Sequence, residues 1–248
     1  MRAYERLLKY VTIASASNEK CTECPSAPGI WEMARALEKE MCSMGLADVE
    51  LDANCYLTAA IPATVEGAPV LGFIAHMDVS PASPCEGVKT RIVENYDGGD
   101  IILDKTRGVV TKAADFPALA KYRGKDLIVT DGSTLLGADD KAGVAEILTM
   151  AEALLADKSI RHGRIRLAFT PDEEIGRGVA RFDVAKFAAD YGYTVDGGPF
   201  GEISCENFNA SAARVTFTGR SVHPGTAKNI IVNAQVAAAE SFELLTPL

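Results

Sequence analysis

Long hydrophobic runs are missing from this chain: no stretch approaches the roughly 18 consecutive apolar residues that a membrane-spanning helix needs. The first ten residues, MRAYERLLKY, carry four charges, which predicts an amphipathic helix and argues against a signal peptide. Basic residues are also few, since 25 Lys and Arg stand against 34 Asp and Glu, for a net charge of -9. This balance argues against nucleic acid or an anionic membrane as a partner.

Histidine is scarce and cysteine is scattered. The chain has six cysteines and three histidines, His76, His162 and His223. Without a secretory signal, we expect reduced thiols in a cytoplasmic protein. Cys21 and Cys24 form a lone C-x-x-C with no second pair and no following βαβ pattern, so an ordinary loop is favoured over a metal or redox site.

The remaining composition is that of a folded protein with one large domain, or one domain and part of another. The chain has 248 residues, of which 48% are hydrophobic and 24% charged. Strand-like and helical segments alternate, and in chain order they cover 28–44 (helix), 49–61 (strand pair), 69–75 (strand), 140–156 (helix), 164–169 (strand), 179–189 (helix) and 191–195 (strand). A Gly-, Pro- and Asp-rich excursion fills 80–126. We therefore predict a mixed α/β fold with a largely parallel sheet flanked by helices.

The character of the sequence changes near residue 205. Residues 213–219 alternate between polar and apolar, which predicts a half-exposed antiparallel strand, and 231–245 have helical spacing. We interpret 1–206 as one domain and 207–248 as the beginning of a second, α+β domain. A lone strand and helix cannot bury a core of their own.

Four polar clusters stand where a predicted strand ends or a helix begins. They are His76-Met77-Asp78, Ala138-Asp139-Asp140-Lys141, Asp172-Glu173-Glu174 and Val195-Asp196-Gly197-Gly198. Ligands of open α/β sheets bind at the carboxyl ends of strands, so we expect the clusters to converge in one cleft at that edge. Carboxylate oxygens, one imidazole and a spare carboxylate are the groups that a two-metal hydrolase needs.

Each cluster also has an ordinary structural explanation. His76 could be a core histidine beside a surface acid. Asp139 and Asp140 could simply cap a helix. Glu173 and Glu174 could form a solvated acidic turn, although adjacent carboxylates repel each other unless cations or protons relieve them. The shared placement of all four clusters at strand ends favours the metal site over four coincidences.

These residues resemble the M20 family of di-zinc metallopeptidases, and within it the tripeptide aminopeptidases. The resemblance covers essentially the whole chain. Its most specific stretches are IVENY (92–96) with GGD (98–100), LLGADDKAG (135–143), AFTPDEE (168–174), TVDGG (194–198), ENFNA (206–210) and VHPGTAK (222–228). The fold that it implies is a zinc-exopeptidase domain followed by a lid domain.

The resemblance also implies a role for each site residue. The implied ligands of two zinc ions are His76, Asp139, Glu174 and Asp196, with Asp139 shared between the ions. Asp78 would support His76, and Glu173 would be the general base that activates water and returns the proton to the leaving amine. His223 resembles a lid-domain histidine that in dimeric relatives reaches the reacting carbonyl of a neighbouring subunit, which allows a homodimer through the second domain.

Relatives of this family run well beyond residue 248, and their last segment brings a final histidine ligand. His162 lies in a polar turn and is a poor candidate for that ligand. We therefore expect an N-terminal fragment of a cytoplasmic enzyme that releases the N-terminal residue from tripeptides, with one zinc ligand supplied from outside this sequence. The alternatives are another M20 hydrolase, such as an N-acyl amino-acid hydrolase or a dipeptidase, and a non-catalytic truncated homologue.

Overall fold

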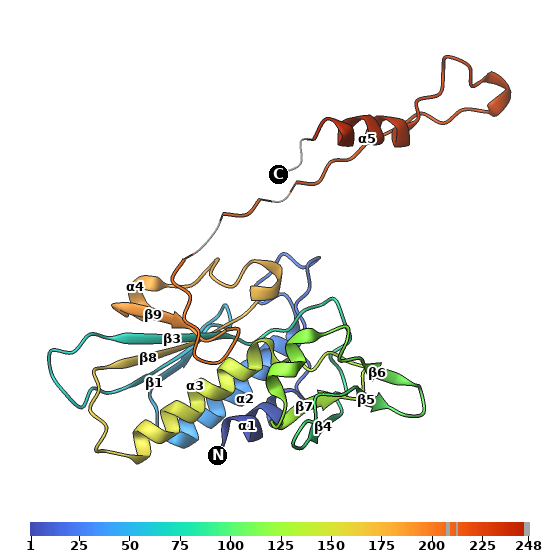
Figure 1. Ribbon diagram of the computed structural model, residues 1–248. Coiled ribbons are helices and arrows are strands. Elements are labelled where there is room, and N and C mark those ends of the chain that lie inside the picture. Colours follow the sequence, from blue (N-terminus) through green and yellow to red (C-terminus); the bar gives the residue numbers. More distant parts are fainter. Residues whose placement is uncertain (207–208, 212, 246–248) are drawn as a thin grey trace. The chain divides into compact units, whose positions relative to one another are not determined.

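The computed structural model describes residues 1–206, 209–211 and 213–245, which fall into two compact units, Met1–Glu202 and Ile203–Leu248 (Figure 1). The first unit contains the main sheet and all four polar clusters that the sequence analysis singled out. No helix in these described ranges is long and apolar enough to cross a membrane.

The first unit is built on a five-stranded mixed sheet. Its strand order is β1 (Ala47–Leu51), β2 (Leu57–Ile61), β8 (Ile165–Thr170), β3 (Leu71–His76) and β9 (Tyr191–Thr194). The β1–β2 and β2–β8 pairs are antiparallel, whereas β3 is parallel to both β8 and β9. His76 is level with Thr170, and Ile74 with Thr194, so the carboxyl ends of the three parallel strands share one edge. The predicted mixed α/β fold is confirmed.

Three helices, α1 (Ala3–Tyr10), α2 (Pro28–Met44) and α3 (Ala138–Ala156), cover one face of this sheet (Figure 1). The predicted helix at 28–44 has these bounds, and Gly45 ends it with a left-handed φ of 78°. Its buried stripe consists of Ile30, Met33, Ala34, Leu37 and Met41. This stripe and the inner face of α3 form one hydrophobic core with alternate residues of the strands.

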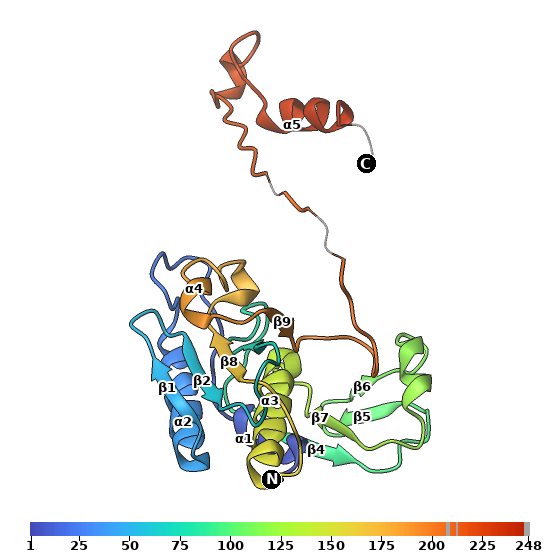
Figure 2. The same ribbon diagram turned by 90° about the vertical axis from the view of Figure 1, so that its left-hand side faces the viewer.

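The excursion after β3 forms two small two-stranded sheets. One pairs β4 (Thr90–Val93) with β7 (Leu127–Thr130), and the other pairs β5 (Ile101–Asp104) with β6 (Val109–Thr111). A short 3₁₀ helix, η1 (Pro117–Tyr122), precedes β7. Figure 2 shows these strands to one side of the main sheet. After β7 the chain enters α3, whose first residues, 138–141, form the second polar cluster.

The helix predicted at 179–189 is wrong in its extent, because only α4 (Val184–Phe187) is helical. Asp183 caps this short helix by accepting a hydrogen bond from the Lys186 N–H at 2.9 Å. Ala188 ends it with a left-handed φ of 51°. The Phe187 ring packs closely against Gly72 of β3, since a Cβ added to Gly72 would lie 2.5 Å from the ring.

The second unit contains α5 (Ala234–Glu243) and the 3₁₀ helix η3 (Pro224–Thr226). The helix predicted at 231–245 is therefore confirmed, with an Asn233 cap at its start. The strand predicted at 213–219 is wrong. The only strand-like pairing among the described residues of this unit is one antiparallel bridge between Arg220 and Val232. A strand needs a partner for its backbone hydrogen bonds, and no described residue pairs with 213–219.

Candidate metal centre

The polar clusters lie together at the carboxyl edge of the parallel strands. His76 is the last residue of β3, and Asp196 follows the end of β9 by two residues. Glu173 and Glu174 lie in the 3₁₀ helix η2 (Glu173–Ile175), just after β8. Asp139 lies at the start of α3. Four separate elements therefore deliver these side chains to one edge, as strand order and parallel register require.

The imidazole of His76 is the centre of this arrangement. It is buried, and its Nε2 lies 2.9 Å from an Asp139 oxygen, 3.7 Å from a Glu173 oxygen and 3.7 Å from an Asp196 oxygen. Donor atoms of His76, Asp139 and Asp196 all lie within 4.8 Å of one another. The Glu174 carboxylate instead lines a neighbouring hollow of about 390 Å³, together with residues 17–20 and 80–82.

Asp78 supports both His76 and the acidic turn. It is fully buried, and its backbone oxygen lies 3.0 Å from the Nδ1 of His76, with a carboxylate oxygen 3.5 Å away. The same carboxylate accepts hydrogen bonds from the backbone N–H groups of Glu173 (3.0 Å) and Glu174 (3.1 Å), and from the Ser17 hydroxyl. The sequence predicted Asp78 as a partner of His76 alone. Its hydrogen bonds to the Glu173–Glu174 turn are a further role that the structure reveals.

The first residues of α3 depart from helical geometry, with ψ of 108° at Asp139 and φ of -117° at Asp140. The break leaves the Asp139 side chain mostly exposed and beside His76. Asp140 is buried instead, where its carboxylate accepts from the N–H groups of Gly143 and His76, both at 3.1 Å. Asp140 is therefore a helix cap, as the ordinary explanation held, and it also ties α3 to β3.

Gly143 lets α3 approach the end of β9. A Cβ at this position would lie 1.8 Å from the carbonyl oxygen of Val195 and 2.4 Å from an Asp140 oxygen. No side chain fits there, and Val195 is the neighbour of Asp196. Gly143 thus sets how closely the end of β9, and with it Asp196, approaches α3.

The pKa shifts of the clustered side chains indicate that a cation would stabilise the site. Burial lowers the pKa of His76, but Asp78, Asp140 and Asp196 outweigh burial and raise it to about 10. Burial, then repulsion from Asp196, raises the pKa of Asp140 to about 8. Burial is also the main cause that raises the pKa values of Glu173, Glu174 and Asp196. An imidazole among under-compensated carboxylates is a donor set that fits a divalent metal such as zinc.

A cleft of about 730 Å³ opens beside Asp139 and Asp196. Its walls come from the start of α3, including Glu146, from Tyr122 of η1 and from residues 194–202. Pockets of this size hold small molecules, so the cleft is large enough for a short peptide. All of its lining residues belong to the first unit.

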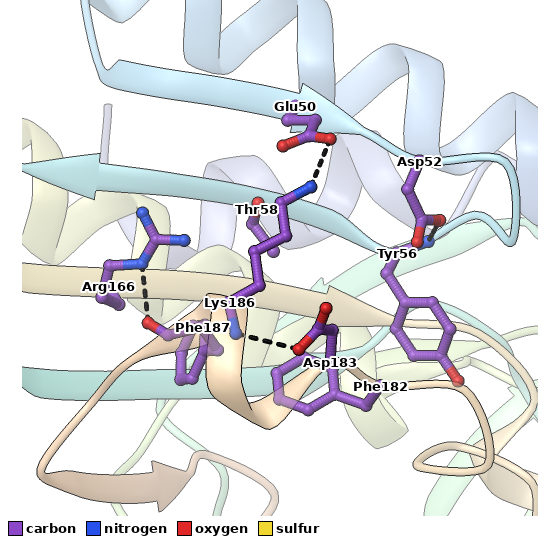
Figure 3. Close-up of a pocket in the computed structure, with 9 residues that line it drawn as sticks. All are labelled: Glu50, Asp52, Tyr56, Thr58, Arg166, Phe182, Asp183, Lys186 and Phe187. Carbon is purple, nitrogen blue, oxygen red and sulfur yellow. Dashed lines mark hydrogen bonds and ion pairs between the residues drawn. The ribbon is translucent and has the colours of Figure 1, made fainter.

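A second, much smaller cavity of about 30 Å³ lies on the other face of the sheet, under α4 (Figure 3). Lys186 pairs with Glu50 at 2.6 Å, and the Arg166 Nε donates to the Phe187 carbonyl at 3.0 Å. These contacts fasten α4 to β1 and β8 (Figure 3). The cavity has room for about one water molecule, so we interpret it as a small gap in the packing between α4 and the sheet and not as a ligand site.

The comparisons with known proteins agree with this geometry. A model of peptidase family M20/M25/M40 matches residues 128–244. Peptidase T of Geobacillus kaustophilus is 49% identical over 98% of this chain and 59% of the relative. Peptidase T of Caldanaerobacter subterraneus subsp. tengcongensis is 50% identical over 100% of this chain and 61% of the relative. This chain contains a peptidase family M20 domain. It spans about three fifths of the length of the curated relatives it matches.

Solved structures of two peptidases share the fold. The aminopeptidase PepT from Bacillus cereus aligns with a TM-score of 0.61 at 25% identity, over 100% of this chain and 57% of that chain. A tripeptidase from Staphylococcus aureus aligns with the same TM-score and identity, over 98% of this chain and 55% of that chain. The M20 resemblance predicted from the sequence motifs is confirmed.

Of the two further histidines, His162 lies outside the cluster around His76, and His223 lies within the second unit. His162 precedes β8, at the end of the strand opposite Glu173, and its Nδ1 lies 2.7 Å from the Gly163 carbonyl oxygen. His223 belongs to the second unit, is exposed, and caps η3 by accepting from the Gly225 N–H at 3.1 Å. The proposed role of His223 stays a prediction.

The sequence predicted no role for several residues that shape the site. They are Ser17, Ser26, Lys141, Gly143 and Asp172. Lys141 is buried, its Nζ donates to the Ile13 carbonyl at 2.6 Å, and burial lowers its pKa to about 8. This contact anchors the segment that leads to Ser17. Such residues act through partners far away in the chain, which no local pattern reports.

Proposed function

We propose that this chain forms the catalytic part of a zinc-dependent aminopeptidase that releases the N-terminal residue from tripeptides. The observation that carries the proposal is the convergence of His76, Asp139 and Asp196 donors within 4.8 Å, with the Glu173 carboxylate beside them. The curated relatives at about half identity are named peptidase T, and one solved neighbour is titled a tripeptidase. The cleft beside Asp139 would receive the peptide.

Two zinc ions are proposed, as the family resemblance implies. His76 and Asp196 would hold one ion, Asp139 would be shared, and Glu174 would serve the other ion from the neighbouring hollow. When bound, zinc polarises a peptide carbonyl and lowers the pKa of water. Zinc sites have about four ligands, so the second ion needs more donors than Asp139 and Glu174 supply.

Glu173 is the proposed proton carrier. Its backbone is held by Asp78, while its side chain lies 3.7 Å from His76 Nε2 without being needed to complete the three-donor cluster. It would take a proton from the attacking water and return it to the nitrogen of the leaving peptide. Burial raises the pKa of Glu173, which brings it closer to neutrality and suits a group that must both accept and release a proton.

The substrate class is tested by assaying the intact protein with zinc. We expect release of the N-terminal residue from an unblocked tripeptide, and little activity on dipeptides or N-acyl amino acids. Preferred hydrolysis of N-acyl amino acids would assign the chain to another M20 activity. A protein that binds zinc but cleaves none of these substrates would be a non-catalytic homologue.

The roles of the paired glutamates are separated by two variants. Glu173→Ala is expected to keep its zinc and to lose about 10²–10⁴-fold in turnover, the usual worth of a general base. Glu174→Ala is expected to lose zinc. Glu32→Ala, on the exposed side of α2, is the control for an ordinary lost carboxylate. Equal zinc loss in both site variants would show that the two roles are assigned wrongly.

A further inference from the structure

The turn that carries Glu173 and Glu174 is preceded by a buried acid, Asp172. This residue is fully buried and has a left-handed φ of 60°. Its carboxylate accepts from the Ser26 N–H at 2.9 and 3.0 Å and from the Ser26 hydroxyl at 2.5 Å. The Ser26 hydroxyl oxygen also accepts from the Asn18 N–H at 2.8 Å. Hydrogen bonds from residues 18–26, near the N-terminus, thus hold Asp172, the residue next to Glu173.

An ionised carboxylate without exposure to water is costly unless hydrogen bonds or a cation compensate it. Within the described residues, Asp172 makes no ion pair, so hydrogen bonds from Ser26 are its compensation. An apolar residue would fill this position more cheaply if packing were the only requirement. This acid lies directly before two functional carboxylates, and that location points to a functional benefit that offsets the cost of its burial.

The acidic turn is held at both ends. At its start, Asp172 is bound to Ser26, and the Asp78 carboxylate accepts from the N–H groups of Glu173 and Glu174. At its end, the Arg177 N–H donates to the Asp172 carbonyl at 2.9 Å. The turn is therefore closed on itself and fastened by two buried carboxylates. This opposes the repulsion that would drive Glu173 and Glu174 apart.

We propose that Ser26 and Asp172 are positioning residues for the reaction: through the backbone of the turn they fix Glu173 beside His76 and Glu174 at the neighbouring hollow. This inference rests on the proposed function, because it concerns the same general base and the same zinc ligand. Neither residue touches the substrate. A shift of about 1 Å in a catalytic group can cost about 10²-fold in rate, so loosening the turn should be measurable.

The test uses Asp172→Asn and Ser26→Ala in the intact protein. Asparagine tolerates the left-handed conformation of residue 172, removes the charge and replaces one accepting oxygen with an NH₂ donor. Each variant is expected to lower kcat on a tripeptide at least tenfold, with KM within about twofold. Zinc titration of the metal-free protein should show an affinity about 10–100-fold weaker, the usual effect of losing the support of a metal ligand. The double variant should be no worse than the worse single variant, because the two residues act as one unit.

Asp183→Asn is the matched control, since Asp183 also accepts one backbone hydrogen bond but lies on α4, away from the cluster. It is expected to leave kcat and zinc affinity unchanged. Should Asp172→Asn not fold, Ser26→Ala keeps the two backbone bonds to Asp172 and still provides the test. A variant whose unfolding temperature falls while kcat and zinc affinity hold would make the pair merely structural and overturn the inference. Additive losses in the double variant would overturn it too.

The zinc titration separates this inference from the proposed function. If the wild-type protein does not cleave tripeptides, the proposed function fails. Weaker zinc binding in Asp172→Asn would then still support the positioning of Glu174, and unchanged binding would overturn it.

Discussion

Replacing Gly143 by alanine should have two opposing effects on the free energy of unfolding. Gly143 lies inside α3, and a helical Gly→Ala change ordinarily stabilises a protein by up to about 1 kcal/mol. Here the new Cβ would lie 1.8 Å from the Val195 carbonyl oxygen, which is about 1.6 Å short of ordinary contact at 3.4 Å. Overpacking that forces backbone movement costs about 1–3 kcal/mol. We therefore expect Gly143→Ala to destabilise the protein by about 1–2 kcal/mol.

The displacement should also reach the metal centre. Val195 precedes Asp196, and metal sites tolerate departures of only about 0.2 Å in ligand distance. A shift of the strand end by an appreciable part of the overlap would pull Asp196 from His76 and Asp139. Zinc affinity is expected to fall at least about tenfold, the lower range for disturbed support of a metal ligand.

Denaturant unfolding of the metal-free protein and zinc titration measure the two effects. Gly192→Ala is the matched control, because Gly192 lies on β9 itself and its added Cβ would meet only the Ile74 side chain at 3.8 Å. That variant should keep zinc affinity unchanged. If Gly143→Ala were as stable as wild type, or more stable, with full zinc affinity, the close approach would not govern the position of Asp196.

Two other changes follow from the contacts. Gly178→Ala would place a Cβ 3.2 Å from the Glu173 Cα, so we expect several-fold lower kcat with zinc content retained; unchanged kcat would show that Glu173 gives way freely. Buried Arg6 pairs with Glu40 at 2.9 Å and with Glu152 at 3.1 Å, and exposed Lys9 also pairs with Glu40. Glu40→Gln removes one of the two carboxylates of Arg6 and should cost about 1.5–3 kcal/mol at pH 7. Burial raises the pKa of Glu40, but Lys9 and Arg6 outweigh it and hold that pKa below its ordinary value. The wild-type advantage should therefore be complete above about pH 4.5 and shrink as pH falls through the folded-state pKa; a difference independent of pH in urea unfolding would contradict this.

The positions of the site clusters could be predicted because each follows a short local pattern. An apolar run ends at His76, another ends just before Asp172, and the edge at which parallel strands finish is common to them. The supports could not be predicted. Ser17 and Asp78 are 61 residues apart, and Ser26 and Asp172 are 146 residues apart. Neither periodicity nor spacing reports such pairs, because they exist only once the chain has folded.

The wrong secondary-structure predictions share that cause. The alternation at 213–219 satisfies a strand pattern, yet a strand is a property of two segments, and no described residue pairs with it. The shortened helix at Val184–Phe187 ends where Phe187 packs against β3, a contact that its own sequence does not encode. Local preference alone therefore did not determine the structure in either place.

The convergence of one imidazole and several carboxylates has a consequence for how long the protein lasts in a cell. Crowding these like charges destabilises the folded protein, and a divalent ion restores the lost stability only when it is bound. A ligand at 100 times its Kd adds about 2.7 kcal/mol to the folded state. A shift of that size changes the unfolded population about 100-fold, and proteases degrade that population. On the proposed function, loss of zinc would thus promote degradation of the protein as well as its inactivation, and its abundance would follow the metal supply.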